Sequence, residues 1–312
     1  MGALMLAVFA LTLPIYLLIA LGFFVAKVGY VAVADMRAIG RVVLRVAMPA
    51  LIFLALARAP LAETLRWDFM AGYAVGSLVI FTAGFALARG PLRRPMPQAA
   101  LEALGMACSN SAYLGMPVAA ILVGDVALQA FAMAMLVENI VILPLAVVLA
   151  EASGGGGRMA AFKRTLGGMV RNPLLIAVLV GVAASLTGLV LPAAVMQVMG
   201  MLAPVAAPVA LLVIGSAVAD LPPSGVGGAA VARVVFGKLV LHPLAVLAGF
   251  YLFGPPAPAL LISGVLIASV PMLSTFALFG LRWGNEALAA TSLIVATVVS
   301  FFTVSGLLAL LG

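Results

Sequence analysis

The sequence predicts an all-α polytopic membrane protein with ten transmembrane helices, arranged as two inverted five-helix repeats in which crossover helices 4 and 9 are broken. Its composition, its recurring apolar runs and an internal repeat support this prediction. Of the 312 residues, 66% are hydrophobic and only 8% are charged, and the mean hydropathy is +1.33. Soluble domains carry roughly 25% charged residues. We therefore expect a chain that lies in the lipid bilayer and has no soluble domain.

Apolar runs of about 20 residues recur along the chain, and each is long enough to cross a hydrocarbon core about 30 Å thick. The longest connection, residues 151–171, is rich in glycine and basic residues. It predicts a cytoplasmic linker between a first repeat at 1–150 and a second at 172–312. The ten predicted spans are 4–26, 38–57, 67–89, 97–122, 126–149, 172–190, 193–219, 229–252, 257–280 and 287–311.

The distribution of basic residues predicts the orientation of these spans. With ten spans both termini share one side, and we place them outside. Only Arg58 and Arg66 then lie outside, while the other 14 of the 16 Lys and Arg residues lie inside or at inner helix ends. This bias follows the positive-inside rule for a cell (inner) membrane protein. It explains the net charge of +7 without a nucleic-acid partner.

An internal repeat indicates how the two halves are related. Under a gap-free shift of 159 residues, three prolines fall on prolines and four glycines fall on glycines. At the chain's 19 Pro and 32 Gly, chance predicts about half a proline match and about one glycine match. An odd number of spans in each unit inverts the second one, as in many secondary transporters. The matches are Pro14/Pro173, Pro49/Pro208, Pro97/Pro256, Gly22/Gly181, Gly29/Gly188, Gly90/Gly249 and Gly105/Gly264.

A polar, helix-breaking stretch, "ACSNSAYLGMPV" (107–118), lies inside the predicted fourth span. The repeat places it opposite "ASVPMLSTF" (268–276) in the ninth span. Pro117 and Pro271 are the predicted crossover prolines, because a proline removes a backbone hydrogen bond and clashes with the preceding turn. Broken helices survive at membrane depth only within protein or along a wet cavity. Half-helix N-termini suit an anion, and carbonyl ends suit a cation.

Several segments resemble the auxin efflux carrier family: "SNSAYLGMP" (109–117), "MPALIF" (48–53), "PVALLVIGSAV" (208–218), "KLVLHPL" (238–244) and "FALFGLRWG" (276–284). The resemblance covers essentially the whole chain and is closest in size to bacterial malonate or malate transporters. It implies alternating access, with spans 1, 2, 6 and 7 as a scaffold and spans 3–5 and 8–10 as a transport domain. The substrate site would then lie at the crossed helices 4 and 9, and the scaffold helices are a candidate homodimer interface.

The polar residues of the two breaks are the candidate substrate-binding groups. Asn110 leads them, because its amide both donates and accepts hydrogen bonds and because it matches the asparagine that the family places at the crossover. The alternative is that Asn110 only caps a half-helix. For the serine and threonine candidates the alternative is that their hydroxyls only form hydrogen bonds with the backbone, as small hydroxyls in membrane helices often do. The remaining candidates are Ser109, Ser111 and Tyr113 in the first break and Ser269, Ser274 and Thr275 in the second.

Glu138, near the centre of the fifth span and next to Asn139, is the candidate coupling group. A charged acid there costs about 2.5–3.5 kcal/mol, so it should face a cavity, form a pair or carry a proton. It departs from the family, which has an uncharged polar residue here. Lys238 either snorkels at a helix end or lies deeper and pairs with Glu138 or the substrate. Thr297 is the tenth-span counterpart of Glu138, and His242, the single histidine, is either structural or a proton carrier.

The sequence contains no metal-ligand cluster, P-loop or nucleophile–base pair, which argues against an enzyme and against ATP-driven transport. We expect a secondary transporter of a small organic anion such as malonate or another dicarboxylate, with no cofactor beyond coupling by H⁺ or Na⁺. A cation/proton antiporter of related architecture is the alternative, since Glu138 allows it, although an intramembrane aspartate pair is missing. A sensor or assembly protein would not need paired broken helices.

The predicted orientation is testable by cysteine labelling of the linker. In a Cys108→Ala background, Ser153→Cys should resist a membrane-impermeant maleimide in intact cells and react in inverted membrane vesicles, because residues 151–171 face the cytoplasm. Labelling from the exterior of intact cells would refute this orientation.

Overall fold

The computed structural model describes residues 2–58, 65–151, 167, 171–189, 191–220, 228–273 and 275–311. Throughout these residues the regular structure is helical, apart from one isolated antiparallel β-bridge between Ser109 and Met272. The described part of the chain therefore confirms the predicted all-α class. Most of the predicted linker and the candidate residue Ser274 lie outside the described residues.

The helices of the first half include two that turn into a π-helical segment and continue, and one that is broken. Helices α2, η1 and α3 follow one another without a gap, as do α8, η3 and α9, whereas α6 is separated from η2 and α7. The elements are α1 (Gly2–Lys27), α2 (Val33–Val42), η1 (Val43–Ala47), α3 (Met48–Arg58), α5 (Trp67–Arg89), α6 (Met96–Ala107), η2 (Ser111–Gly115), α7 (Met116–Val123), α8 (Val126–Val137), η3 (Glu138–Ile142) and α9 (Leu143–Glu151).

The second half shows a similar sequence of elements, with a π-helical turn inside one long helix and a break between α15 and α16. The elements are α11 (Pro173–Thr187), α12 (Ala193–Ala219), α13 (Gly228–Phe236), η4 (Gly237–Leu241), α14 (His242–Phe253), α15 (Pro258–Ser269), α16 (Phe276–Arg282) and α17 (Glu286–Leu311).

Several of these helices are long and apolar enough to cross a membrane, so the chain is a multi-pass membrane protein. Five meet this condition by length and composition within the described residues, and shorter apolar helices lie at Tyr16–Lys27, Pro173–Thr187 and Pro258–Ser269. Large apolar side chains such as Leu17, Met201 and Leu252 stay more than half exposed, which suits contact with lipid. The five are Trp67–Arg89, Val126–Glu151, Ala193–Ala219, Gly228–Phe253 and Glu286–Leu308.

The π-helical turns share a common origin in proline. Each of η1 to η4 ends two residues before a proline, namely Pro49, Pro117, Pro144 and Pro243. The residue before each proline bonds five residues back instead of four; Met116 N–H, for example, donates to the Ser111 carbonyl. Proline has no N–H and crowds the carbonyl four residues earlier, so the turn widens.

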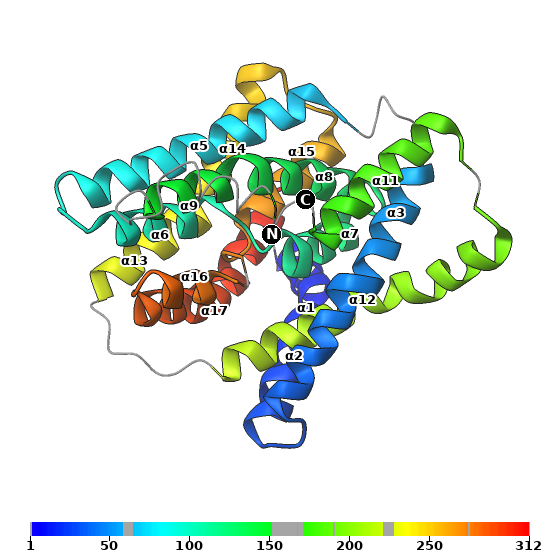
Figure 1. The fold of residues 1–312 in the computed structure, drawn as a ribbon, viewed down its shortest axis with the longest axis horizontal. Coiled ribbons are helices and arrows are strands. Elements are labelled where there is room, and N and C mark those ends of the chain that lie inside the picture. The colour runs from blue at the N-terminus through cyan, green and yellow to red at the C-terminus, as the bar shows by residue number, and fades with distance from the viewer. Residues whose placement is uncertain are drawn as a thin grey trace.

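Close helix pairs hold the two halves together. Helix α1 packs against α12, α3 against α11, and α5 runs alongside α14 at one edge of the molecule (Figure 1). Glycines let the first pair approach closely: a Cβ built on Gly22 would lie 2.0 Å from the Leu212 carbonyl oxygen, and one on Gly215 would lie 1.9 Å from the Ile19 carbonyl oxygen. Small residues at such crossings bring helix backbones together in membranes.

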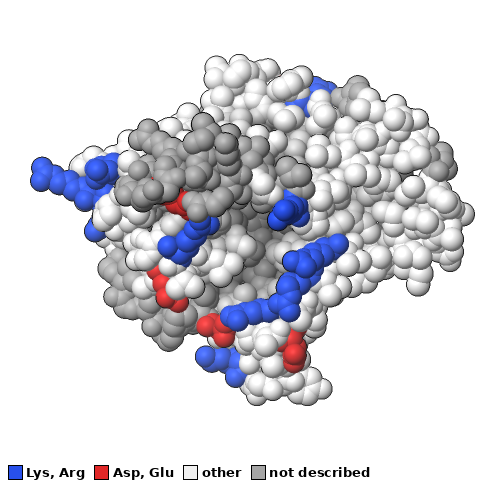
Figure 2. All heavy atoms as spheres, in the orientation of Figure 1, with Lys and Arg blue, Asp and Glu red and all other residues white. Residues whose placement is uncertain are grey.

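Charged side chains are unevenly spread over the surface. On the face drawn in Figure 2, Lys and Arg side chains border the recess near the centre of the view, and the right-hand lobe shows almost only uncharged side chains. An uncharged surface of this kind suits the hydrocarbon layer, where charge is costly.

Helices α6 and α15, which precede the two breaks, are separated by a different offset from the one that the sequence repeat predicted. Both ends of α15 lie 162 residues after the ends of α6 (258 − 96 and 269 − 107). The gap-free shift of 159 residues is therefore wrong by three residues at this helix. Connections between elements tolerate insertions far better than packed helices do, so the offset changes along the chain.

The contact between α1 and α12 generates a stability prediction. Gly215→Ala should destabilise the protein by about 1–3 kcal/mol, because the new methyl group overlaps backbone atoms that cannot move away. The matched control is Gly200→Ala in the same helix, where a Cβ would meet nothing within 4 Å. It should be neutral or stabilise the helix by up to about 1 kcal/mol. Thermal unfolding of both purified variants in detergent measures the difference, and equal effects would contradict the prediction.

Candidate functional site

The two helix breaks meet and satisfy each other's backbone. After α6 ends at Ala107, the chain is extended at Cys108, and Ser109 pairs with Met272 in the isolated bridge. The Asn110 N–H donates to the Pro271 carbonyl at 2.8 Å. Buried backbone groups need such partners, most of all where no water is present. The crossover is therefore a mutual backbone contact between segments far apart in the sequence.

The two predicted crossover prolines have different positions. Pro271 lies within the second break, as the sequence indicated. Pro117 does not interrupt its helix: the first break covers residues 108–110, and Pro117 lies in the first turn of α7, after η2. Its effect is the π-helical turn that begins at Ser111, because the carbonyl that proline leaves unpaired is accommodated by a wider turn.

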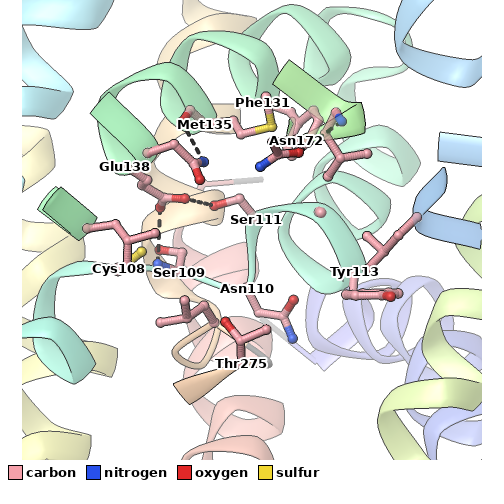
Figure 3. Close-up of a pocket in the computed structure, with 16 residues that line it drawn as sticks. Cys108, Ser109, Asn110, Ser111, Tyr113, Phe131, Met135, Glu138, Asn172 and Thr275 are labelled. Atoms are coloured by element: carbon pink, nitrogen blue, oxygen red, sulfur yellow. Dashed lines mark hydrogen bonds between the residues drawn. The ribbon is translucent and has the colours of Figure 1, made fainter. Parts of the chain in front are cut away.

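A cavity of about 150 Å³ opens beside the crossover (Figure 3). It is smaller than the roughly 300–1,000 Å³ of sites for drug-sized ligands, so its size suits a small molecule. Apolar side chains such as Phe131 and Leu174 form part of its wall. The polar and charged lining consists of Ser109, Asn110, Ser111, Tyr113, Glu138, Asn139, Asn172 and Thr275.

Asn110 lies in this lining with its side-chain amide unpaired among the described residues. The Asn110 carbonyl accepts the N–H groups of Leu114 and Gly115, so the backbone caps the helix and the side chain makes no cap bond. Thr275, just before α16, lines the same cavity without a side-chain cap bond. These two residues bring the two halves of the chain to one site, as predicted.

Asn172 is a lining residue that the sequence analysis missed. Its side-chain oxygen accepts the N–H groups of Leu174 and Leu175 at the start of α11, which leaves its amide nitrogen at the cavity. An asparagine directly before a proline and an apolar run is an N-cap signal. That signal predicts a helix start at Pro173, but the position of the cap beside the crossover follows only from the tertiary fold.

Glu138 is buried at the cavity wall, and three donors converge on its carboxylate. The Tyr73 hydroxyl donates to Oε1 at 2.8 Å, the Ser109 backbone N–H donates to Oε1 at 3.1 Å, and the Ser111 hydroxyl donates to Oε2 at 2.7 Å. A backbone N–H can only donate, so the arrangement suits an acceptor. Charge-assisted bonds of this kind are stronger than neutral ones. The carboxylate thus belongs to the crossover itself (Figure 3).

Lys238 lies deep in the protein with no exposed surface, so the snorkelling alternative does not apply. Its ammonium donates to Ser109 Oγ at 2.9 Å and to the Ala268 carbonyl at 2.5 Å, and it lies 2.9 Å from His242 Nδ1. Each of the three ammonium N–H groups has an acceptor when His242 is neutral and carries its proton on Nε2. That nitrogen lies 2.9 Å from Ser77 Oγ. The last turn of α15, just before the second break, therefore holds the lysine through its backbone.

Ser109 joins the two charged groups. Its N–H bonds to Glu138 and its hydroxyl accepts from Lys238, whereas these two residues form no direct ion pair in the described structure. Tyr73 and Ser77 complete the cluster from α5, four residues apart and so on one helix face. The sequence analysis missed both, because a tyrosine and a serine in an apolar helix gain meaning only from the partners across the interface.

Other candidate residues use their polar groups within the fold. The Tyr113 hydroxyl donates to the Gly40 carbonyl of α2 at 3.2 Å, and the Asn139 amide donates to Met135 in its own helix, although both residues line the cavity. Ser269 and Thr297 donate to the carbonyls four residues earlier and are not part of the described lining. No group of three or more potential metal ligands lies within the residues that the structure describes.

Comparison with known proteins points to transport. A family model described as "Membrane transport protein" matches residues 7–165 and 159–308. The chain is also 28% identical over 306 residues to a protein of Rhizobium meliloti (strain 1021) named "Putative malonate transporter", with 96% of this chain and 95% of that protein covered. Family and relative are transporters rather than enzymes, in agreement with the sequence analysis.

The Ser109 bridge generates a prediction for a double-mutant cycle. Lys238→Met should destabilise the protein strongly, because it leaves the Glu138 carboxylate without a nearby cation. Combining it with Glu138→Gln should recover part of this loss, with a coupling free energy of about 0.5–3 kcal/mol. Thermal unfolding of the two single variants and the double variant in detergent supplies the cycle. Strictly additive effects would show that Ser109 does not couple the two groups.

Proposed function

The chain belongs to the membrane transport protein family, which confirms the resemblance to auxin efflux carriers, and on this basis we propose that it is a secondary transporter of a small organic anion. The observation that carries the proposal is the cavity at the crossed breaks. There an unpaired Asn110 amide, the Ser111 end of the η2–α7 helix and Thr275 surround about 150 Å³ of space. An amide donor and a helix N-terminus both favour an anion.

We propose malonate or a similar small dicarboxylate as the substrate. The name of the Rhizobium meliloti relative supports malonate, and the small cavity volume supports an anion of a few heavy atoms. A gradient of H⁺ or Na⁺, or the membrane potential acting on the anion's own charge, would drive transport. The protein would lie in the cell inner membrane with both termini outside.

The proposed architecture is ten spans in two inverted repeats. Helix contacts support it, because α1 packs on α12 and α3 packs on α11. A two-fold axis that exchanges span 1 with span 6 and span 2 with span 7 turns the first of these contacts into the second. These four spans would form the scaffold and a homodimer interface. The cavity is lined both by Leu44 and Leu174, from proposed scaffold spans, and by the crossover, so alternating access would expose it by moving one group of helices past the other.

The cation/proton antiporter is less well supported. Glu138 is the one acid in the described cavity lining. Its two oxygens already accept three hydrogen bonds, which leaves few lone pairs for a bound cation.

Uptake into proteoliposomes tests the proposed function. Vesicles containing the purified chain should accumulate radiolabelled malonate when a pH or sodium gradient is imposed, and empty vesicles should not. A panel of unlabelled mono- and dicarboxylates added as competitors would define the substrate class. Failure of every carboxylate to enter or compete, together with cation exchange for protons, would replace the proposal by the antiporter.

Asn110→Ala should weaken substrate binding roughly 5- to 150-fold, because loss of one amide leaves about 1–3 kcal/mol of polar interaction unmade. The control is Ser263→Ala in α15, which removes a buried hydroxyl that donates to the Ala259 carbonyl of its own helix. It should bind with wild-type affinity. Binding of labelled malonate to both purified variants makes the comparison, and wild-type affinity in Asn110→Ala would remove this residue from the site.

A further inference from the structure

The cavity is lined by a negative charge, whereas a binding site for an anion is expected to carry a positive charge or none. Glu138 is the one charged residue in its described lining, and the nearby Lys238 lies behind Ser109 and outside that lining. An ionised Glu138 would repel an incoming carboxylate, since charges interact strongly in a low-dielectric site. The site therefore needs a means of removing this negative charge when an anion binds.

The hydrogen bonds of Glu138 indicate how its negative charge is removed. Two of its donors, the Ser109 N–H and the Ser111 hydroxyl, belong to the crossover segment next to Asn110. A substrate carboxylate bound at the crossover would need the same donors, because they lie where the second half of the broken helix begins. Figure 3 shows the Glu138 side chain bonded to Ser109 and Ser111, so a carboxylate of the protein already holds the donors that a substrate carboxylate would use.

We infer that Glu138 is an internal carboxylate that fills the anion site of the empty carrier, and that a substrate anion takes over its crossover donors while Glu138 takes up one proton. This inference rests on the proposed function of the same cavity. The proton comes from water and binds to a Glu138 oxygen. The Tyr73 hydroxyl, which lies outside the described cavity lining, remains the partner of the protonated side chain.

The titratable groups around Glu138 are poor acceptors for the proton that accompanies the substrate, which leaves Glu138 as the acceptor. Tyr73 faces it from α5 and Cys108 from the end of α6, and both side chains are ordinarily neutral near pH 7. Lys238, from η4, is already matched to three acceptors. His242 lies behind Lys238 and, like it, outside the described cavity lining. A proton that accompanies the substrate therefore goes to Glu138.

Charge balance then specifies the charge of the substrate. In the empty carrier Glu138 and Lys238 sum to zero, and in the loaded carrier a neutral Glu138, Lys238 and a singly charged anion again sum to zero. A dianion would leave one uncompensated negative charge in the buried cluster, which is costly. The transported species is therefore a monoanion, either a monocarboxylate or a dicarboxylate that keeps one acidic proton, and it moves with one proton.

Binding of monomethyl malonate as a function of pH tests this inference. This probe carries one negative charge throughout the range from about pH 6 to about pH 8, so a pH dependence must come from the protein. Displacement of labelled malonate from the purified full chain gives its affinity. The wild type should lose about tenfold in affinity per pH unit once Glu138 ionises in the empty state. Glu138→Gln should show no such slope.

Two further variants keep the test decisive. Glu102→Gln makes the same change at a buried acid outside the cavity, which is paired with Arg233 at 2.6 Å, and it should retain the wild-type slope. Tyr73→Phe removes one donor from the ionised carboxylate, so the decline in affinity should begin at a higher pH. A slope that persists in Glu138→Gln, or a wild type without a slope, overturns the inference while anion binding still supports the proposed function.

The net charge that crosses the membrane with each substrate is tested separately, by uptake under an imposed membrane potential. Uptake of labelled malonate by wild-type proteoliposomes should be insensitive to an imposed membrane potential, because the anion and its proton cross together. Uptake that is driven by the potential overturns the monoanion–proton stoichiometry. Failure of malonate to bind to the wild type at any pH instead overturns malonate as the proposed substrate, and the inference is lost with it.

Discussion

The two helix breaks of this membrane protein depend on one contact, in which each break supplies a backbone partner to the other. An unsatisfied backbone group in hydrocarbon costs several kcal/mol, and here the Asn110 N–H reaches the Pro271 carbonyl. The same crossing lets one residue, Ser109, contact both Glu138 and Lys238, while Ala268, at the end of α15, accepts a hydrogen bond from the lysine. The cavity, the Asn110 amide and the bridge from Glu138 through Ser109 to Lys238 thus all lie at one backbone contact between distant segments.

Proline shapes this site in two distinct ways. Pro271 lies within a break, whereas Pro117, Pro144 and Pro243 each follow a π-helical turn. Ser111, Glu138 and Lys238 lie in these three turns. A π-helical turn changes the direction in which side chains leave the helix and is often found at functional sites. These turns thereby direct polar side chains toward the crossover, two of them within continuous helices and one at the start of the helix that follows the first break.

Much of this arrangement could be predicted from the sequence. Composition indicated the all-α membrane class, and the polar stretch around Asn110 together with Pro271 predicted where the helices break. The roles of Tyr73, Ser77 and Asn172 could not be predicted, because they arise from contacts between helices whose packing cannot be read from the sequence. Ser269 and Thr297 were predicted as candidate residues from their polar groups alone, and the structure adds that their hydroxyls bond within their own helices, as small hydroxyls in apolar helices often do. The repeat offset was wrong because connections vary in length.

The complete burial of Lys238 bears on how the chain is assembled during synthesis. A lysine at the centre of a membrane helix costs about 2.5–3.5 kcal/mol on insertion. Of its two oxygen acceptors, Ser109 is made before the lysine and Ala268 is made 30 residues after it. At about 5–20 residues per second, those 30 residues take roughly 2 to 6 seconds of translation. For that interval the nascent chain holds an ammonium group with an incomplete set of partners, so the helix that carries Lys238 reaches its final environment only after α15 has been synthesised.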